Sequence, residues 1–385
     1  MRIRSTTVDT VDSPISSAYA LLDTHSSDRT LLDLGQAAPQ YPPAPVVREH
    51  LAEVVRSAHG GDYTDVPGLP KLREAMAEDL SLAYGGAVRP ENVVVTAGCN
   101  QAFSLVVSAL AGAGDEVVVP LPYYFNHDMW LRLNGIRPVY LEPGADLVPR
   151  AAAAEPLITP RTRAIVLVTP GNPTGATVAP EGIAEFAALA RRHGIALILD
   201  ETYRSFRDTD EAAHGLFADP EWGRTVISLH SFSKEFAIPG YRVGAVVASA
   251  EFNREVCKLL DCVAVCAPRV GQEAAWIGLT QARAWRRERA QDIARQRAWL
   301  RTALADRPGG FELVASGGFF GWLRHPFDGC STDEVVRRLV VEQDMLLLPG
   351  TAFQPEDRNT LRISVSNIDR SAIDDFAGRL RAVGR

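Results

Sequence analysis

A lysine in a polar turn is the residue with the clearest chemical potential in this sequence. Lys234 lies in Ser228–Gly244 (SLHSFSKEFAIPGYRVG), where a β-rich run gives way to a short turn. Burial and nearby positive charge would lower the pKa of this lysine and expose the neutral amine that attacks an aldehyde. Ser231 and Arg242 suit a phosphate on the same ligand, because a guanidinium can bind phosphate bidentately. Taken alone, the segment could also be a surface turn with an ordinary lysine.

Two further motifs offer groups for a pyridine-type ring. PGNPTG follows the apolar run AIVLVT and holds Asn172, whose amide can hydrogen-bond a ring oxygen. DETY follows IALIL, and its Asp200 carboxylate can keep a pyridine nitrogen protonated, while Tyr203 can reach the ring oxygen. Taken singly, the first motif is an ordinary turn and the second a helix cap.

The motif TAGCNQAF lies at a predicted junction between a strand and a helix. Free N–H groups at a helix N-terminus bind anions, so Gly98, Cys99 and Asn100 would point backbone donors at a phosphate. The alternative is a simple helix start, and the Cys99 side chain is not required in either case.

In this order the motifs resemble those of the class I/II aminotransferase family, which are fold type I enzymes of the aspartate aminotransferase superfamily. The resemblance runs from about Leu31 to Arg362. It implies an enzyme dependent on pyridoxal 5′-phosphate (PLP) that moves an amino group between an amino acid and a 2-oxo acid by a ping-pong mechanism. The matching motifs are LDLGQAAP, YTDVPGLPKLREA, TAGCNQAF, PLPYYFN, VTPGNPTG, LDETY, SFSKEFAIPGYRVG and LRISVS.

The resemblance assigns roles around the cofactor. Lys234 matches the lysine that forms the Schiff base and then moves the substrate proton, with Asp200 and Tyr203 as the other catalytic residues. Tyr124 matches the aromatic residue on the ring face, although Tyr123 is one position away. The cofactor contacts are Tyr63, Gly98, Cys99, Asn100, Tyr124, Asn172, Asp200, Tyr203, Ser231, Lys234 and Arg242.

Other residues are assigned to the substrate and to a second subunit. Arg362 matches the arginine that holds the substrate α-carboxylate, for which its fork geometry is suited. Gly35 and Asn172 lie beside the same substrate. Tyr63 matches a tyrosine that reaches the phosphate of the neighbouring subunit, which implies a homodimer with shared active sites.

The chain departs from the family pattern at several positions. Ala37 stands in LGQAAP where a second glycine is usual. Asn126 and His127 either face the substrate or begin a surface helix. His230 either approaches the site or is packed in the core.

The same residues would serve other PLP chemistry. β- or γ-Elimination or replacement, decarboxylation and oxidative deamination, as in secondary-metabolite biosynthesis, are therefore the alternative to transamination. A non-catalytic PLP-binding domain is disfavoured because both Lys234 and Arg362 are present.

Apolar runs alternate with helical patterns along the middle of the chain, which predicts an α/β fold with a mostly parallel central sheet. A long charged helix after Gln281 is expected to join two domains. We expect a large PLP-binding domain over 46–281 and a smaller α+β domain built from 1–45 and 282–385. The runs expected as strands are Asn92–Thr96, Glu116–Val119, Ala164–Thr169, Ile195–Leu199, Val226–Leu229 and Val243–Ala248.

Composition and charge argue against several classes of binding partner. A net charge of -7 with no basic stripe argues against nucleic acid. The N-terminus lacks an apolar signal region, and no apolar run approaches the ~18 residues of a membrane span, so a cytoplasmic protein is expected. Cys257, Cys262 and Cys266 fit an amphipathic helix better than a metal site, and no metal is expected.

Overall fold

A computed structural model describes residues 3–23, 25–209 and 211–383. Its largest sheet has seven strands in the order β2-β8-β7-β6-β5-β3-β4, and β8 runs antiparallel to both neighbours. The predicted α/β fold with a mostly parallel sheet is therefore confirmed. The strands are β2 (Val93–Thr96), β3 (Glu116–Pro120), β4 (Arg137–Leu141), β5 (Thr162–Val168), β6 (Ala196–Asp200), β7 (Val226–Ser231) and β8 (Gly244–Val247).

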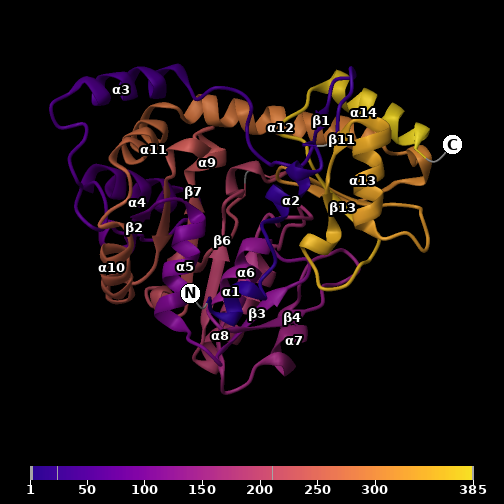
Figure 1. The fold of residues 1–385 in the computed structure, drawn as a ribbon. Coiled ribbons are helices and arrows are strands. Elements are labelled where there is room, and N and C mark those ends of the chain that lie inside the picture. Colours follow the sequence, from indigo (N-terminus) through magenta and orange to yellow (C-terminus); the bar gives the residue numbers. More distant parts are fainter. Residues whose placement is uncertain (1–2, 24, 210, 384–385) are drawn as a thin grey trace.

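Helices cover both faces of this sheet (Figure 1). Successive strand residues point to opposite faces, so Val93 and Val95 join one core cluster and Val94 the other. On the first face lie α3 (Pro45–Arg56), α4 (Pro70–Tyr84), α7 (Ala151–Ala154), α8 (Pro180–His193) and α11 (Arg269–Gln281). On the second lie α5 (Cys99–Leu110), α6 (Phe125–Leu133) and α10 (Ala250–Ala264). Two of the three clustered cysteines, Cys257 and Cys262, lie within α10, as expected for a helix.

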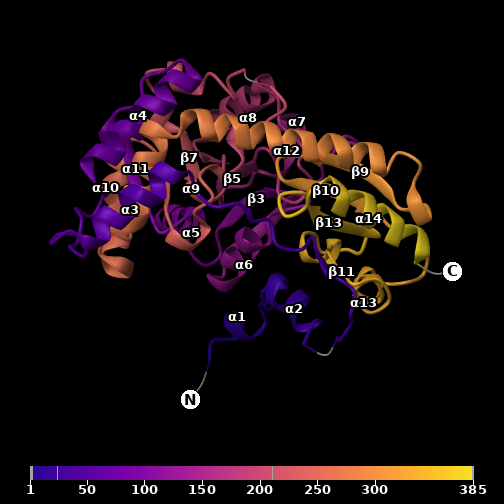
Figure 2. The ribbon, with the colours of Figure 1, turned by 90° about the horizontal axis from the view of Figure 1, so that it is seen from above.

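The C-terminal part forms a second core around a four-stranded sheet in the order β12-β13-β10-β9. Figure 2 shows α12 (Arg283–Ala303) extending from the large sheet to these strands, as predicted for the long charged helix. Its buried residues, Ile293, Arg297 and Leu300, face this second core. The remaining elements are β9 (Glu312–Gly317), β10 (Phe320–Arg324), α13 (Thr332–Gln343), β11 (Met345–Leu346), β12 (Leu348–Pro349), β13 (Thr360–Ser364) and α14 (Arg370–Ala382).

The N-terminal segment crosses from one part of the molecule to the other. Strand β1 (Leu32–Asp33) pairs in parallel with β11, and Leu32, Leu34 and Ala37 are buried in the second core. Before it come α1 (Ser5–Val8) and α2 (Pro14–Ala20), and α2 packs near Phe125 of α6. Among the described residues, no helix is both long and apolar enough to span a bilayer.

Candidate active site

A cavity of about 310 Å³ opens where β5, β6 and β7 end. Ligands of open α/β sheets bind at this edge. The cavity brings together predicted residues from six separate motifs. It is lined by Ile15, Gln36, Ala37, Cys99, Asn100, Tyr124, Phe125, Val168, Asn172, Asp200, Thr202, Tyr203, Ser231, Ser233, Lys234, Pro239, Arg242 and Arg362.

Lys234 lies on α9 (Phe232–Glu235), a single helical turn that directly follows β7. Ser231 caps this turn by accepting a hydrogen bond from the backbone N–H of Ser233 at 3.3 Å. Burial, together with the charges of Arg362 and Arg242, lowers the pKa of Lys234 to about 8. About a tenth of the molecules therefore carry the neutral amine at pH 7, far more than for a lysine with an ordinary pKa.

Asp200 ends β6 with its carboxylate facing the cavity, and His127 lies behind it. His127 Nε2 is 3.3 Å from Asp200 Oδ2, and the backbone N–H of Thr202 donates to Oδ1 at 3.0 Å. Burial raises the pKa of Asp200, but the nearby His127 imidazole and the Thr202 N–H outweigh it, and the pKa lies below its usual value. An ionised carboxylate here fits a protonated ring nitrogen.

His127 was expected either to face the substrate or to begin a surface helix, and neither expectation was right. The side chain is 1% exposed and stacks on Phe103 with ring centroids 3.9 Å apart, so it neither faces the substrate nor lies on a surface helix. The burial of the first turn of α6 against α5 places it there. A histidine three residues after Tyr124 was a signal in the sequence, but its partner could not be identified without the fold.

The geometry distinguishes the two adjacent tyrosines. Tyr124 lines the cavity, and its hydroxyl lies 3.3 Å from Asn100 Oδ1 and accepts a hydrogen bond from Asn126 Nδ2 at 2.9 Å. Tyr123 instead stacks on Tyr140, 5.5 Å away, outside this cavity. The position of Tyr124 therefore suits a ring-stacking residue, and Asn126 orients it.

Anion-binding groups lie at one end of the cavity. Helix α5 begins at Cys99, so the first backbone N–H groups of this helix lack partners within the helix. Gly98 precedes it with φ +90°, and a Cβ there would lie 2.5 Å from Arg242 Nη2. Only glycine lets the guanidinium approach so closely. Backbone donors, the Ser231 hydroxyl and Arg242 together form a donor set that fits the phosphate of PLP.

Arg362 projects from β13 and is fully buried. Its Nη1 donates to Asn172 Oδ1 at 3.1 Å, its Nη2 donates to the Gly35 carbonyl, and its Nε has no partner among the described residues. Burial lowers the pKa of Arg362 to about 10. The rings of Phe320 and Phe353 lie 5.2 and 5.1 Å from the guanidinium carbon. A buried cation that faces a cavity and keeps a free donor suits a carboxylate ligand.

Tyr63 and His230 do not line this cavity. Tyr63 is 79% exposed, and its backbone carbonyl accepts from Arg269 Nη2 at 3.2 Å. His230 is buried in the core, which is one of the two positions expected for it. It lies 2.8 Å from Ser228 Oγ near Glu201, and burial lowers its pKa to about 4.

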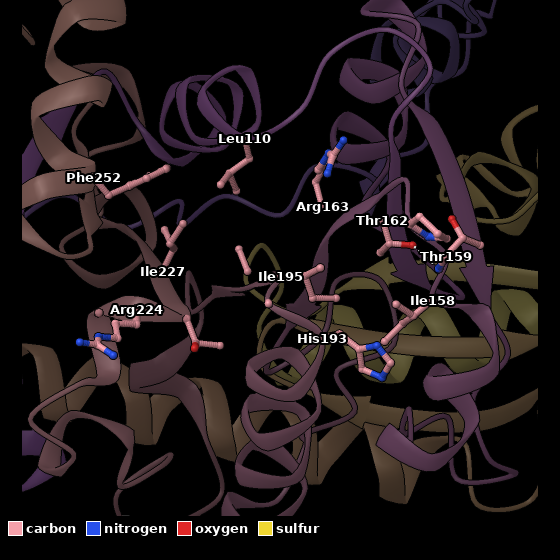
Figure 3. A pocket seen from close by; sticks show the side chains of 15 residues that line it. Leu110, Ile158, Thr159, Thr162, Arg163, His193, Ile195, Arg224, Ile227 and Phe252 are labelled. Atoms are coloured by element: carbon pink, nitrogen blue, oxygen red, sulfur yellow. Dashed lines mark hydrogen bonds between the residues drawn. The ribbon is translucent and has the colours of Figure 1, made fainter.

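A second hollow, of about 540 Å³, lies at the opposite edge of the sheet (Figure 3). Thr162, Ala196 and Thr225 line it, at or next to the first residues of β5, β6 and β7. The groups with evident chemistry stand at the other ends of these strands, so this hollow is not the candidate site.

Comparison with known proteins decides the family. A sequence profile described as aminotransferase class I and II matches residues 29–380. The chain belongs to this family. It is a PLP-dependent aminotransferase, and its substrates are amino acids and oxo acids.

Relatives of this aminotransferase cover most of its length. An aromatic aminotransferase of Arabidopsis thaliana is 29% identical over 91% of this chain and 89% of its own. An arginine–pyruvate transaminase of Pseudomonas aeruginosa is 32% identical over 84% of this chain and 82% of its own. The structure of Thermus thermophilus aspartate aminotransferase with maleate matches with a TM-score of 0.91 at 26% identity and covers both chains completely. Transamination is therefore favoured over the other PLP reactions.

Proposed function

We propose that Lys234 holds the cofactor through its amine. The same amine then carries a proton between the substrate Cα and the aldehyde carbon of the cofactor. The observation that carries this proposal is the convergence of Lys234, Asp200 and Arg362 on one cavity. Bound PLP supplies an aldehyde carbon and a ring that accepts electron density from Cα. The lowered pKa of Lys234 suits a group that must take and return a proton near neutral pH.

We propose the following ring contacts from the residues that line the cavity. Asp200, supported by His127, keeps the ring nitrogen protonated. Asn172 and Tyr203 would hold the ring oxygen, and Tyr124 would stack on the ring. The phosphate is held by backbone donors of Gly98, Cys99 and Asn100 and by Ser231 and Arg242.

The substrate carboxylate binds Arg362. Asn172 and the Gly35 carbonyl orient its guanidinium, because each accepts a hydrogen bond from it. The Nε of Arg362 has no partner among the described residues, and Phe320 and Phe353 flank the guanidinium. Arg362 can therefore donate a hydrogen bond to a ligand in the cavity. Gly35 also places its backbone next to the substrate.

We propose further that the substrate side chain is uncharged. The cations that line the cavity among the described residues are Lys234, Arg242 and Arg362, and each already has a role. The rest of the lining includes apolar groups from three segments: Ile15, Ala37 and Phe125. This composition favours an aromatic or aliphatic amino acid over aspartate. It also disfavours a cationic side chain, because the acidic group that lines the cavity in the described chain, Asp200, faces the ring nitrogen.

We propose that the enzyme is a cytoplasmic homodimer. The exposed Tyr63 side chain supports this assembly, since its assigned role at a phosphate requires an active site other than that of its own chain. We also propose the domain division into 46–281 and the pair 1–45 and 282–385. The separate cores around the seven-stranded and four-stranded sheets support it.

A half-reaction tests this function. The purified holoenzyme is mixed with each member of an amino-acid panel in the absence of an oxo acid. We expect neutral amino acids to release one equivalent of 2-oxo acid per site and then stop. Continuous release of ammonia or CO₂ would contradict transamination, and a faster reaction with aspartate than with phenylalanine or leucine would contradict the proposed side-chain class.

A further inference from the structure

Four buried charged side chains meet next to the active-site lysine. Asp79 lies on α4, Arg204 begins a short 3-10 turn (Arg204–Phe206), Glu235 lies on α9 and Arg286 lies on α12. Arg204 Nη2 is 2.5 Å from Asp79 Oδ2 and 3.4 Å from Glu235 Oε1. Arg286 is 2.7 Å from Glu235 Oε1 and 3.2 Å from Asp79 Oδ1. Each arginine therefore contacts both carboxylates, and we call this set the four-charge cluster.

The cluster has no net charge and is largely buried. Its side chains are between 4% and 18% exposed, and Ser205 Oγ donates a further hydrogen bond to Glu235 at 2.5 Å. Burial raises the pKa of Glu235, but the charges of Arg204 and Arg286 outweigh it, so this carboxyl stays ionised. Loss of one member would leave an uncompensated buried charge, which is much more costly than loss of an exposed ion pair.

Two members of the cluster are sequence neighbours of residues that line the active-site cavity. Glu235 directly follows Lys234, and Arg204 directly follows Tyr203. Arg286 stands near the start of α12, which continues to the elements that carry Arg362 (Figure 2). None of the four lines the cavity of Lys234; three of them line a separate hollow of about 540 Å³ between α4 and α12. The cluster thus joins the segments that carry the chemistry without entering the site.

We propose that the four-charge cluster positions Lys234 and Tyr203 for the reaction, and that its two arginines and two carboxylates add no net charge to the surroundings of Lys234. This rests on the proposed role of Lys234 and extends it to residues that touch neither cofactor nor substrate. Glu235, Arg204, Arg286 and Asp79 are therefore positioning residues. A misplacement on the order of 1 Å at a reacting group can cost about 10²-fold in rate, so fixing these two backbone segments matters for catalysis.

The charge balance gives the proposal a distinctive consequence. Replacing Glu235 by Gln leaves one extra positive charge, which disfavours protonated Lys234 and lowers its pH midpoint. Replacing Arg286 by Gln leaves one extra negative charge and raises the midpoint. The ionisable groups facing the Lys234 cavity are Cys99, Tyr124, Asp200, Tyr203, Arg242 and Arg362, and those facing Glu235 are Asp79, Arg204, Arg286 and His230, with Tyr84 and Glu201 beyond them.

Acetylation of the full, cofactor-free chain measures this midpoint. Lysines stand at positions 71, 234 and 258, so mass spectrometry resolves each one as a function of pH. A unit charge on the order of 10 Å away should move the Lys234 midpoint by roughly 0.3–1 pH unit. We expect Glu235→Gln to lower it, Arg286→Gln to raise it and the double variant to return close to wild type. Turnover of each single holoenzyme variant should fall roughly tenfold or more.

The control is a pair of oppositely charged residues on α13, Arg338 and Glu342, 3.0 Å apart and more exposed. Replacing both by Gln should change neither midpoint nor turnover. Single variants with unchanged midpoints, or with shifts of the same sign, would overturn the proposal, whereas opposite shifts are not expected from a merely structural role. If Glu235→Gln does not fold, the other two variants still test the proposal. Arg286→Gln should raise the Lys234 midpoint, and the double variant should return it close to the wild-type value. A wild-type chain whose bound cofactor is attached to Lys71 or Lys258 would instead contradict the proposed function.

Discussion

At the scale of single residues, the site depends on groups whose charge is set by burial. Lys234 has a lowered pKa because it is buried between two arginines, and Asp200 stays ionised because His127 supports it. The sequence predicted most side chains of the cavity, since most of the motifs follow strands of the large sheet whose ends meet at one edge. It could not predict how His127 contacts Asp200 or how Arg362 contacts Asn172, since those pairs come from distant segments.

The lowered pKa of Lys234 predicts the pH dependence of cofactor uptake. The neutral amine forms as pH rises through about 8, so the rate at which cofactor-free protein takes up PLP should rise with pH through this range and then level off. Stopped-flow absorbance measures this rate. A rate that continues to rise through pH 10 would show that neither burial nor Arg362 and Arg242 act on this amine.

At the scale of elements, strands that are buried on both faces were predicted closely, because their apolar runs have no other interpretation. Strand β4 was missed: its sequence, RPVYL, lies at the sheet edge, is partly exposed and therefore lacks a continuous apolar run. The sequence of helix α2 also did not indicate that this helix contributes to the active-site cavity. Its short sequence gave no indication that Ile15 reaches the cavity, since that depends on packing against Phe125.

The position of Ile15 predicts a change in substrate preference. Ile15→Lys would place a cation at the cavity, so kcat/KM for aspartate should rise relative to phenylalanine by roughly tenfold. Steady-state kinetics with both amino acids measure the ratio. Val8→Lys, at an exposed position of α1, is the matched control and should leave the ratio unchanged. An equal effect of both variants would show that general charge, rather than a contact in the cavity, alters the preference.

At the scale of the whole molecule, the α/β alternation predicted the fold class, and the seven-stranded sheet confirms it. Which segments pair across the molecule was harder to predict, because β1 joins β11 over more than three hundred residues through only two positions each. The homodimer stays a prediction that depends on Tyr63, whose side chain lies exposed and away from the cavity of its own chain.

Shared active sites predict complementation between two damaged chains. Lys234→Ala should be inactive and Tyr63→Ala weakened. If Tyr63 serves the partner's site, a heterodimer of the two variants has one intact site, so unfolding and refolding an equal mixture should restore roughly a quarter of wild-type activity. Each variant refolded alone is the control. No gain over the Tyr63→Ala protein would show that Tyr63 does not act across subunits.

The most direct test of the central claim is borohydride reduction of the holoenzyme followed by peptide mass spectrometry. The chain offers lysines at positions 71, 234 and 258 as attachment points. Lys71 is paired with Glu273 and Lys258 with Glu255, and neither lines the cavity. We expect the cofactor mass on the peptide that contains Lys234. Its appearance on Lys71 or Lys258, or on no lysine of a protein that has bound PLP, would contradict the central claim.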